Sequence, residues 1–357
     1  MGSAIEVVLF LFMIVLALYI ARLRSLFAAA MLFGIFSLIA AGAQMVMDAV
    51  DVAFTEAAVG AGISTVLLLG ALGLTTSEES RPHQHRFVAL LVVTATGLTL
   101  AYGTLDMPAY GDPDAPIHQH VAPHYLEDSP KEIGVPNVVT SVLASYRGYD
   151  TFGETTVVLA AAVGAILLLG ASAVRTRSRG REGDEETSTG SKPGGDGMSE
   201  SPPTAESPQT TTPIKMRVRE TIVLRVVGKA LVPFILLFAL YVQFHGDYGP
   251  GGGFQAGVIF AAGLILHALI FGLDELREAI PPIVVEIGIA FGALLYGGVG
   301  VVSMFEGGAF LNYSVLDDHN PVHGQHLGIL LVELGVGITV TFVMVAIFYS
   351  FAGRSRQ

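Results

Sequence analysis

The sequence predicts an all-α membrane protein with about nine transmembrane helices in two modules. Hydrophobic residues make up 52% of the chain and charged residues only 14%, whereas soluble domains carry roughly 25% charged residues. Apolar segments of membrane-spanning length, about 20 residues each, recur along the chain. One intervening stretch is almost free of apolar residues and divides these segments into two groups.

About nine segments have the length and apolar character of a transmembrane helix. They are expected at residues 5–21, 26–47, 52–74, 87–101, 154–174, 222–244, 254–272, 283–304 and 324–351. The first is not expected to be a cleaved signal peptide, because Glu6 stands at its start and no small-residue cleavage pattern precedes Arg22.

Basic residues are distributed unevenly between the two sides that nine spans create. Lys131 and Arg147 fall on one side. The other side holds Arg22, Arg24, Arg81, Arg86, residues 175–181 and 215–229, Arg277, Arg354 and Arg356. Because basic loops stay in the cytoplasm, the N-terminus is expected outside and the C-terminus in the cytoplasm.

The apolar-poor stretch is expected to be a disordered cytoplasmic linker. It is rich in acidic residues, Ser, Thr, Gly and Pro, and it cannot bury enough surface to fold. Four regions follow: a three-helix membrane domain at 1–80, a two-helix domain with a long outside loop at 81–175, the linker at 176–214, and a four-helix membrane domain at 215–357.

Acidic side chains stand inside two expected spans, where a charge costs roughly 2.5 to 3.5 kcal/mol at the bilayer centre. Glu56 lies about five residues after Asp51 in the third span, among small residues that allow close helix packing. Glu333 lies about nine residues below Gly324, near mid-membrane. An ion-contacting or proton-transferring role is predicted for Asp51, Glu56 and Glu333. The alternative for Glu56 is a neutral acid hydrogen-bonded between helices, and for Glu333 it is an anchor for a neighbouring subunit.

Two further pairs extend this set. His326 precedes Glu333 by seven residues, which puts both on one helical face about 10 Å apart. Such groups can relay protons if water lies between them. Asp150 and Glu154 are four residues apart and share a face at the outer mouth of the fifth span. Their alternative role is to stabilise a helix N-terminus.

A glycine-rich hairpin joins two membrane-length segments at residues 244–258. Its distinctive residues are His245, Asp247, Pro250, Gly251, Gly252 and Gly253. Glycines permit close backbone approaches, and irregular backbone near membrane depth survives only where protein or a water-filled cavity shields it. A shaped polar feature is therefore predicted at the outer surface, chiefly shaping the packing of the sixth and seventh spans; the alternative is a flexible surface loop.

Several classes of function are excluded or disfavoured. The chain has no cysteine, so disulfides, thiolate metal sites and iron–sulfur ligation are impossible within it. No nucleotide-binding, hydrolase or zinc-protease motif occurs, so neither an enzyme nor a bound cofactor is expected. The net charge of −12 lies in loops and the linker, and nucleic acid is not an expected partner. His118, His120, His124, Asp317, His319 and His323 are expected in solvated loops rather than in a metal site.

Residues 234–257, which contain the hairpin, resemble the MnhB/MrpB family, the four-span subunit of multisubunit Na+/H+ antiporters, and the resemblance extends over about 217–351. Residues 51–62 resemble the MbhD-type domain, and residues 137–154 with the following span resemble the MbhE-type domain. In the antiporters these two domains usually end the large MrpA subunit, whereas in membrane-bound hydrogenases they are separate subunits. Here they precede an MrpB-like domain.

The resemblance implies a transporter subunit in a prokaryotic cell membrane. The complex would exchange cytoplasmic Na+ for external H+, with Glu56 and Glu154 lining an ion route. Implied partners are the lipid bilayer, an MrpA-like subunit without its C-terminal domains, and MrpC-, MrpD-, MrpE-, MrpF- and MrpG-like subunits. Two alternatives remain: the membrane arm of a hydrogenase or related respiratory complex, and a structural subunit that conducts no ions.

Overall fold

The computed structural model describes residues 2–72, 75, 78–79, 86–186 and 222–354. Within these ranges nearly all regular structure is helical, and the β pairing consists of an isolated bridge between Ser25 and Glu78. Eight of the described helical segments are long and apolar enough to span a membrane. The first expected span corresponds to a helix whose apolar part, Ala4–Ile20, is shorter. The all-α multispan prediction is confirmed.

The N-terminal module contains α1 (Gly2–Ile20), α2 (Leu26–Val46) and a third span in three parts. These parts are α3 (Val50–Glu56), the π-helix η1 (Ala57–Ile63) and α4 (Ser64–Leu72). Ser25 caps α2 by accepting a hydrogen bond from the Ala28 nitrogen, which satisfies a donor that the first turn leaves free. Gly60 in η1 lies directly against Ser37 of α2, so small residues bring the two spans close together.

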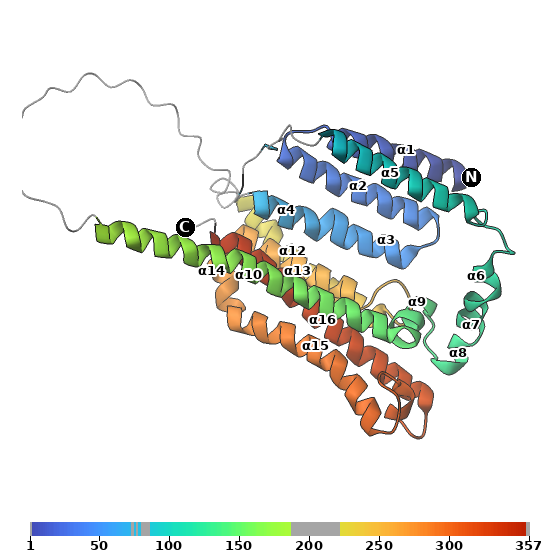
Figure 1. Cartoon of the computed structure of the whole chain (residues 1–357). Coiled ribbons are helices and arrows are strands. Elements are labelled where there is room, and N and C mark those ends of the chain that lie inside the picture. Colours follow the sequence, from blue (N-terminus) through green and yellow to red (C-terminus); the bar gives the residue numbers. More distant parts are fainter. Residues whose placement is uncertain (1, 73–74, 76–77, 80–85, 187–221, 355–357) are drawn as a thin grey trace, which may run out of the picture.

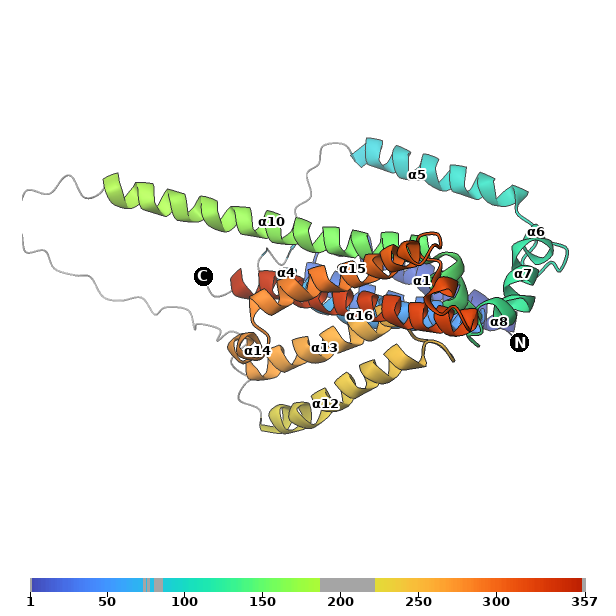
Figure 2. The ribbon, with the colours of Figure 1, turned by 90° about the horizontal axis from the view of Figure 1, so that it is seen from below.

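The second module contains two long helices joined by a folded segment of short helices, residues 104–147. The long helices are α5 (Arg86–Gly103) and α10 (Gly148–Glu186). Between them lie η2 (Thr104–Asp106), α6 (Pro116–Gln119), α7 (Val121–Glu127), α8 (Ser129–Glu132), α9 (Val138–Thr140) and the π-helix η3 (Ser141–Tyr146). In Figure 2, α5 stands apart from α10, and none of its spanning residues is buried.

The third module is a bundle around its last helix. It contains α12 (Ile222–His245), α13 (Gly253–Phe271), the short α14 (Leu273–Ala279), α15 (Pro282–Phe305), η4 (Tyr313–Leu316) and α16 (Pro321–Arg354). Helix α16 packs against α10, α13 and α15, and its Ile329 and Val340 are fully buried. A side chain on Gly257 would lie 2.7 Å from the carbonyl oxygen of Gly337, so glycine is what allows α13 and α16 to touch.

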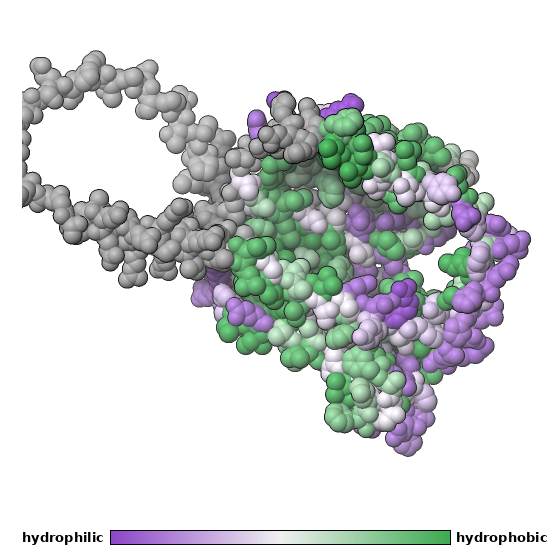
Figure 3. Space-filling model, in the orientation of Figure 1, coloured by the Kyte–Doolittle hydropathy of each residue, from purple (hydrophilic) through white to green (hydrophobic). Residues whose placement is uncertain are grey.

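The long helices run between two ends of the molecule (Figure 1). Helix α1 begins at the end that carries α6–α9 and the turn before α16, whereas α14 and the end of α16 lie at the opposite end. Hydrophilic residues gather along α6–α8, and hydrophobic residues cover much of the helix surface seen in Figure 3. We call the end with α6–α9 the loop end.

The predicted linker, residues 176–214, falls largely outside the described residues. Its first part differs from expectation, because α10 continues as a helix to Glu186. Residues 187–221 lie outside the described ranges.

Candidate functional site

A cavity of about 240 Å³ lies where the three modules meet, near the loop end. This volume has room for several water molecules. Its polar lining comes from α3 of the first module, α9 and α10 of the second and α13, α15 and α16 of the third. These side chains are Asp51, Thr55, Thr140, Thr151, Glu154, Gln255, Tyr296 and Glu333. Three of the predicted carboxylates, Asp51, Glu154 and Glu333, therefore share one cavity although 282 positions separate the first from the last (333 − 51).

The glycine-rich hairpin forms one wall of this cavity and is held by both other modules. The Gly251 nitrogen donates a hydrogen bond to Oδ1 of Asp51 at 3.2 Å. Asn137 Nδ2 donates to the carbonyl oxygens of Gly246 at 3.0 Å and Gly249 at 2.9 Å. Thr140 donates to the same Gly246 oxygen at 2.7 Å. The hairpin is thus a three-module junction in addition to a connection between α12 and α13.

Glycine is required in this hairpin for two physical reasons. Gly252, which precedes α13, has φ of +119°, a conformation that other residues rarely adopt. A Cβ on Gly252 would lie 3.1 Å from Oε1 of Glu333, and one on Gly246 would lie 3.2 Å from Oε2. A Cβ on Gly253 would collide with the Glu333 carbonyl oxygen. The glycine backbone therefore closes over the Glu333 carboxyl group from the loop end.

Two carboxylates act electrostatically on Glu333, namely Asp51 and Asp247. Asp247 lies in the hairpin, and its Oδ2 is 3.3 Å from Nδ1 of His326 on α16. Burial raises the pKa of Asp247 above its ordinary value, although the charge and hydrogen bond of His326 act in the opposite direction. The sequence places His326 and Glu333 on one face of α16, and the structure adds Asp247 beside His326.

The remaining predicted residues lie outside the cavity lining. Glu56 ends α3 with its carboxyl group against Gly60 of the π-helix. Asp150 is exposed and pairs with Arg147, whose Nε donates to Oδ2 at 2.7 Å. His245 stacks on Tyr241 with ring centroids 4.9 Å apart. Pro250 is exposed at the hairpin tip.

Several cavity residues are neutral and were not singled out from the sequence. Gln255 Nε2 donates to Oγ1 of Thr55 at 2.8 Å, which ties α13 to α3. Tyr296 is fully buried, and its hydroxyl donates to the Gly148 carbonyl oxygen at 2.7 Å. A tyrosine within an apolar span must find a partner for its hydroxyl, which is the signal that could have identified Tyr296.

Both π-helices border this junction. Helix η1 follows Thr55 and Glu56 directly, and η3 contributes Leu143 and Ala144 to the cavity lining. Tyr313 of the third module donates a hydrogen bond to the Ala144 carbonyl oxygen at 3.0 Å. Because π-helical turns are rare and concentrate at functional sites, their presence on two sides of the cavity distinguishes it from ordinary helix packing.

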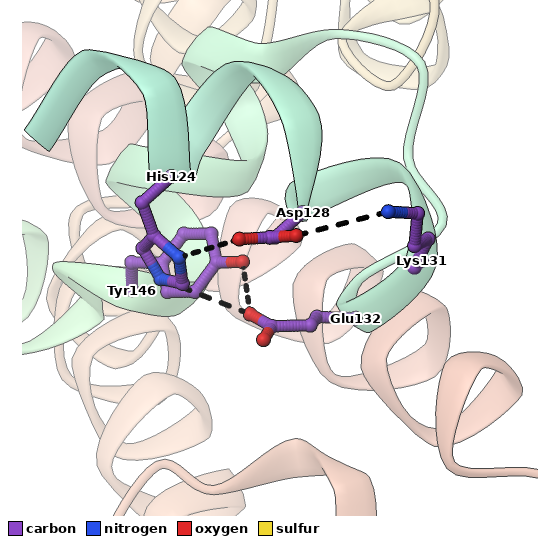
Figure 4. Close-up of polar contacts among 5 residues, drawn as sticks. All are labelled: His124, Asp128, Lys131, Glu132 and Tyr146. Carbon is purple, nitrogen blue, oxygen red and sulfur yellow. Dashed lines mark hydrogen bonds and ion pairs between the residues drawn. The ribbon is translucent and has the colours of Figure 1, made fainter.

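The segment of short helices between α5 and α10 carries a separate polar cluster, shown in Figure 4. His124 Nδ1 lies 3.0 Å from Oδ2 of Asp128, Lys131 lies 3.8 Å from Asp128, and Tyr146 donates to Glu132. Burial and the neighbouring Glu132 raise the pKa of Tyr146. Across the described ranges no three His, Asp or Glu side chains are arranged to hold a metal ion. The cluster fastens α7 and α8 to η3.

Comparison with known families accounts for most of the chain. Residues 11–77 match the MbhD family and residues 84–177 match the MbhE family, and both families are described as subunits of MBH. Residues 223–346 match the MnhB family, described as "Domain related to MnhB subunit of Na+/H+ antiporter". The cavity is lined from all three matched regions.

Individual relatives agree with these matches. "Putative antiporter subunit mnhB2" from Staphylococcus aureus strains Newman and COL is 38% identical over 134 residues, which cover 37% of this chain and 94% of that protein. The solved Mrp complex from Dietzia sp. DQ12-45-1b contains a chain with the same fold, at a TM-score of 0.71 and 22% identity. That match covers 98% of this chain and 35% of the Dietzia chain, so this chain spans about a third of it.

A membrane-bound sulfane sulfur reductase, described as an archaeal respiratory membrane complex, contains a more distantly matching chain. Its TM-score is 0.47 at 25% identity, over 72% of this chain and 95% of that one. The chain belongs to the MnhB family of multi-pass membrane subunits of Mrp-type antiporter complexes, with MbhD-type and MbhE-type domains fused to its MnhB domain.

Proposed function

We propose that this chain forms part of the ion route of an antiporter that exchanges cytoplasmic Na+ for external H+. The observation that carries this proposal is the cavity at the junction of the three modules, because Asp51, Glu154 and Glu333 line it together. Carboxylates at membrane depth are costly and usually face water paths or ion sites. Three of them around one small cavity favour the binding of a proton or a cation, since their negative charges repel one another.

The cavity also suggests why three domains work as one unit. Each domain supplies one carboxylate, so a route that uses all three exists only when the domains are assembled. The proposal includes a cytoplasmic C-terminus, an external N-terminus and residence in a prokaryotic plasma membrane. The uneven distribution of basic residues between the two ends supports this orientation.

The proposed partners follow from the family. An MrpA-like subunit without its C-terminal domains would supply the antiporter part, and MrpC-, MrpD-, MrpE-, MrpF- and MrpG-like subunits would complete the complex. The transported Na+ and H+ are substrates, and no resident cofactor is proposed. Three residues outside the cavity are proposed as secondary positions along or beside the route: Glu56, Asp150 and His245.

Antiport by vesicles that contain the whole complex tests this proposal. Glu333→Gln, Asp51→Asn and Glu154→Gln remove a proton site while keeping the side-chain shape. We expect each to lower the exchange rate by at least about tenfold, a barrier increase of about 1.4 kcal/mol. Glu306→Gln is the matched control, because Glu306 ends α15 outside the cavity. Wild-type exchange by all three cavity variants would rule out the proposed route.

A second candidate function is supported by the descriptions of two matched families. The MbhD-type and MbhE-type domains are described as MBH subunits, so the chain could serve the membrane arm of a hydrogenase or related respiratory complex. A purely structural role is the third candidate, supported by the many hydrogen bonds at the hairpin. Mass spectrometry of the purified native complex tests the second candidate, which iron–sulfur or NiFe subunits would favour. Native gels of the carboxylate variants test the third, which disturbed assembly rather than slower transport by an assembled complex would favour.

A further inference from the structure

A titratable pair lies on the loop-end side of Glu333, outside the cavity lining: Asp247 and His326. His326 and Glu333 lie seven residues apart on α16, a rise of about 10 Å, which is too far for direct proton transfer. Asp247 lies beside His326, with 3.3 Å between Oδ2 and Nδ1. The His326 side chain is 33% exposed and that of Asp247 is 17% exposed. Exposure therefore falls from His326 to Asp247.

The backbone at Gly246 and Asp247 is held by hydrogen bonds from the second module. The Asp247 carbonyl oxygen accepts a hydrogen bond from the Asn137 nitrogen at 3.0 Å. The preceding residue, Gly246, accepts from Asn137 and Thr140 through its own carbonyl oxygen. Gly246 also lies directly over Glu333, because a Cβ there would be 3.2 Å from Oε2. The hairpin thus holds Asp247 beside His326, next in sequence to the glycine that lies over Glu333.

The charged and titratable groups around Asp247 come from α16 and α12. Helix α16 contributes His326 and Glu333, and α12 contributes His245, which is two residues away in sequence. Asp51 of α3 acts on Glu333. Burial raises the pKa of Asp247, which brings its protonated form closer to physiological pH. The carboxyl group is therefore suited to accept and release a proton.

We propose that Asp247 carries protons between the outer surface and Glu333, and that His326 is its positioning partner. This inference rests on the function proposed above for Glu333. In the inward direction, the Asp247 carboxylate takes a proton from external hydronium, which becomes water, or from external water, which becomes hydroxide. The carboxylic acid then gives that proton to the Glu333 carboxylate. Charge and protons balance at both steps, and no redox partner is required.

The test uses the whole complex in vesicles and three substitutions at one position. Asp247→Asn removes the proton site but keeps the shape, whereas Asp247→Glu and Asp247→His keep a titratable group. We expect the maximal exchange rate of Asp247→Asn to fall at least about tenfold, with an unchanged KM for Na+ and normal assembly on native gels. We expect both titratable variants to retain most of the rate, with the His variant showing a shifted dependence on external pH.

A matched control exists at the start of the same helix. His323 pairs with Asp317 at 2.7 Å in an exposed position, and His323→Gln should leave exchange unchanged. For the positioning role, His326→Gln should move the pH profile of exchange without changing the KM for Na+. An exchange rate of Asp247→Asn equal to wild type at every external pH would overturn the proposal. Equal loss of assembly in all three Asp247 variants would also overturn it, since the role would then be packing.

The failure of this inference can be told apart from failure of the proposed function. If Glu333→Gln abolishes exchange while Asp247→Asn does not affect it, the cavity route stands and only the proton entry through Asp247 is wrong. If Glu333→Gln, Asp51→Asn and Glu154→Gln all leave exchange at the wild-type rate, the proposed function itself fails.

Discussion

Asp51 accepts a hydrogen bond from the backbone nitrogen of Gly251 at 3.2 Å, across 200 positions of the chain. This contact joins the start of the third span to the glycine-rich hairpin, and it belongs to a junction at which the MbhD-type, MbhE-type and MnhB domains meet. A substitution at this junction should therefore change both the stability of the complex and its exchange rate, and the two effects can be measured separately.

Asp51→Ala should loosen the first domain from the hairpin. A hydrogen bond to a charged acceptor contributes about 1.5 kcal/mol or more to stability, and Asp51→Asn should retain part of it while losing the charge. We expect Asp51→Ala to melt at a lower temperature than Asp51→Asn in the purified complex, with exchange reduced in both. Equal melting temperatures for wild type and Asp51→Ala would show that the contact contributes nothing to assembly.

Asn137→Ala should destabilise the junction more than an ordinary cap substitution. Asn137 caps α9 and also donates two hydrogen bonds to the hairpin. Asn312 is the matched control, because it caps η4 through a hydrogen bond from the Ser314 nitrogen and does not reach the hairpin. We expect losses of about 2 to 3 kcal/mol for Asn137→Ala and about 1 kcal/mol for Asn312→Ala, measured by denaturation of the complex in detergent.

Gly253→Ala should separate α13 from α16. The added methyl group would collide with the Glu333 carbonyl oxygen, and overpacking of this kind costs typically about 1 to 3 kcal/mol. Gly298→Ala in α15 is the control, because a Cβ there has no neighbour within 4 Å. Melting temperature and complex yield report the difference. A Gly253→Ala complex as stable as the Gly298→Ala complex would contradict the tight packing described for this pair of helices.

Tyr296→Phe should test the buried hydroxyl without disturbing the ring. Phenylalanine keeps the packing against Phe152, whose ring lies 5.3 Å from that of Tyr296, but it leaves the Gly148 carbonyl oxygen without its donor. We expect a loss of about 1 kcal/mol, read as a lower melting temperature. Tyr241→Phe offers a comparison at an exposed tyrosine, where little change is expected.

The pKa values of Asp247 and Asp317 should depart in opposite directions from their ordinary value of 3.8. Burial raises the pKa of Asp247, whereas hydrogen bonds from His323 and from two backbone nitrogens lower the pKa of Asp317. The contribution of ionised Asp317 to the free energy of unfolding is thus fully present above pH 3.8, and it is lost as the pH falls through the lower pKa of the folded state. Ionised Asp247 instead costs stability at high pH, and that cost is relieved as pH falls.

Infrared difference spectra across a pH titration measure these two groups. The carbonyl stretch of protonated Asp247 should appear at a higher pH than that of Asp317, and each band should vanish in the corresponding Asn variant. A common midpoint for both bands would contradict the opposite environments of the two side chains.

The helical spans and the three carboxylates that line the cavity could be picked out from the sequence, because both follow from where apolar and charged residues stand along the chain. The sequence pointed to Glu56 as well as Asp51 in the third span, whereas the structure brings Asp51 and not Glu56 to the cavity lining. The reason is rotational: Thr55 is four residues after Asp51 and shares its face, whereas Glu56 is turned about 140° away in an α-helix. Such rotation relative to distant partners cannot be read from local spacing.

The neutral half of the site was harder to predict. Asn137, Gln255 and Tyr296 become cavity residues or hairpin partners only through contacts with other modules. Their residue types are equally suited to caps, surfaces or helix packing, so nothing in the local sequence distinguishes these roles. The hairpin illustrates the same limit: its glycines indicated a close approach, but its partners in α3 and α9 depend on tertiary packing.

The closing of the cavity by side chains and hairpin backbone bears on how such chains are divided among genes. The described contacts that close it come from α3, the segment from Asn137 to Glu154, the hairpin, α15 and α16, and none of them requires a peptide bond between domains. Fusion raises the local concentration of the parts but leaves the fit between them unchanged. Gene fusion and fission can therefore redraw subunit boundaries around an unchanged junction, so that one working assembly is encoded as one, two or three polypeptides.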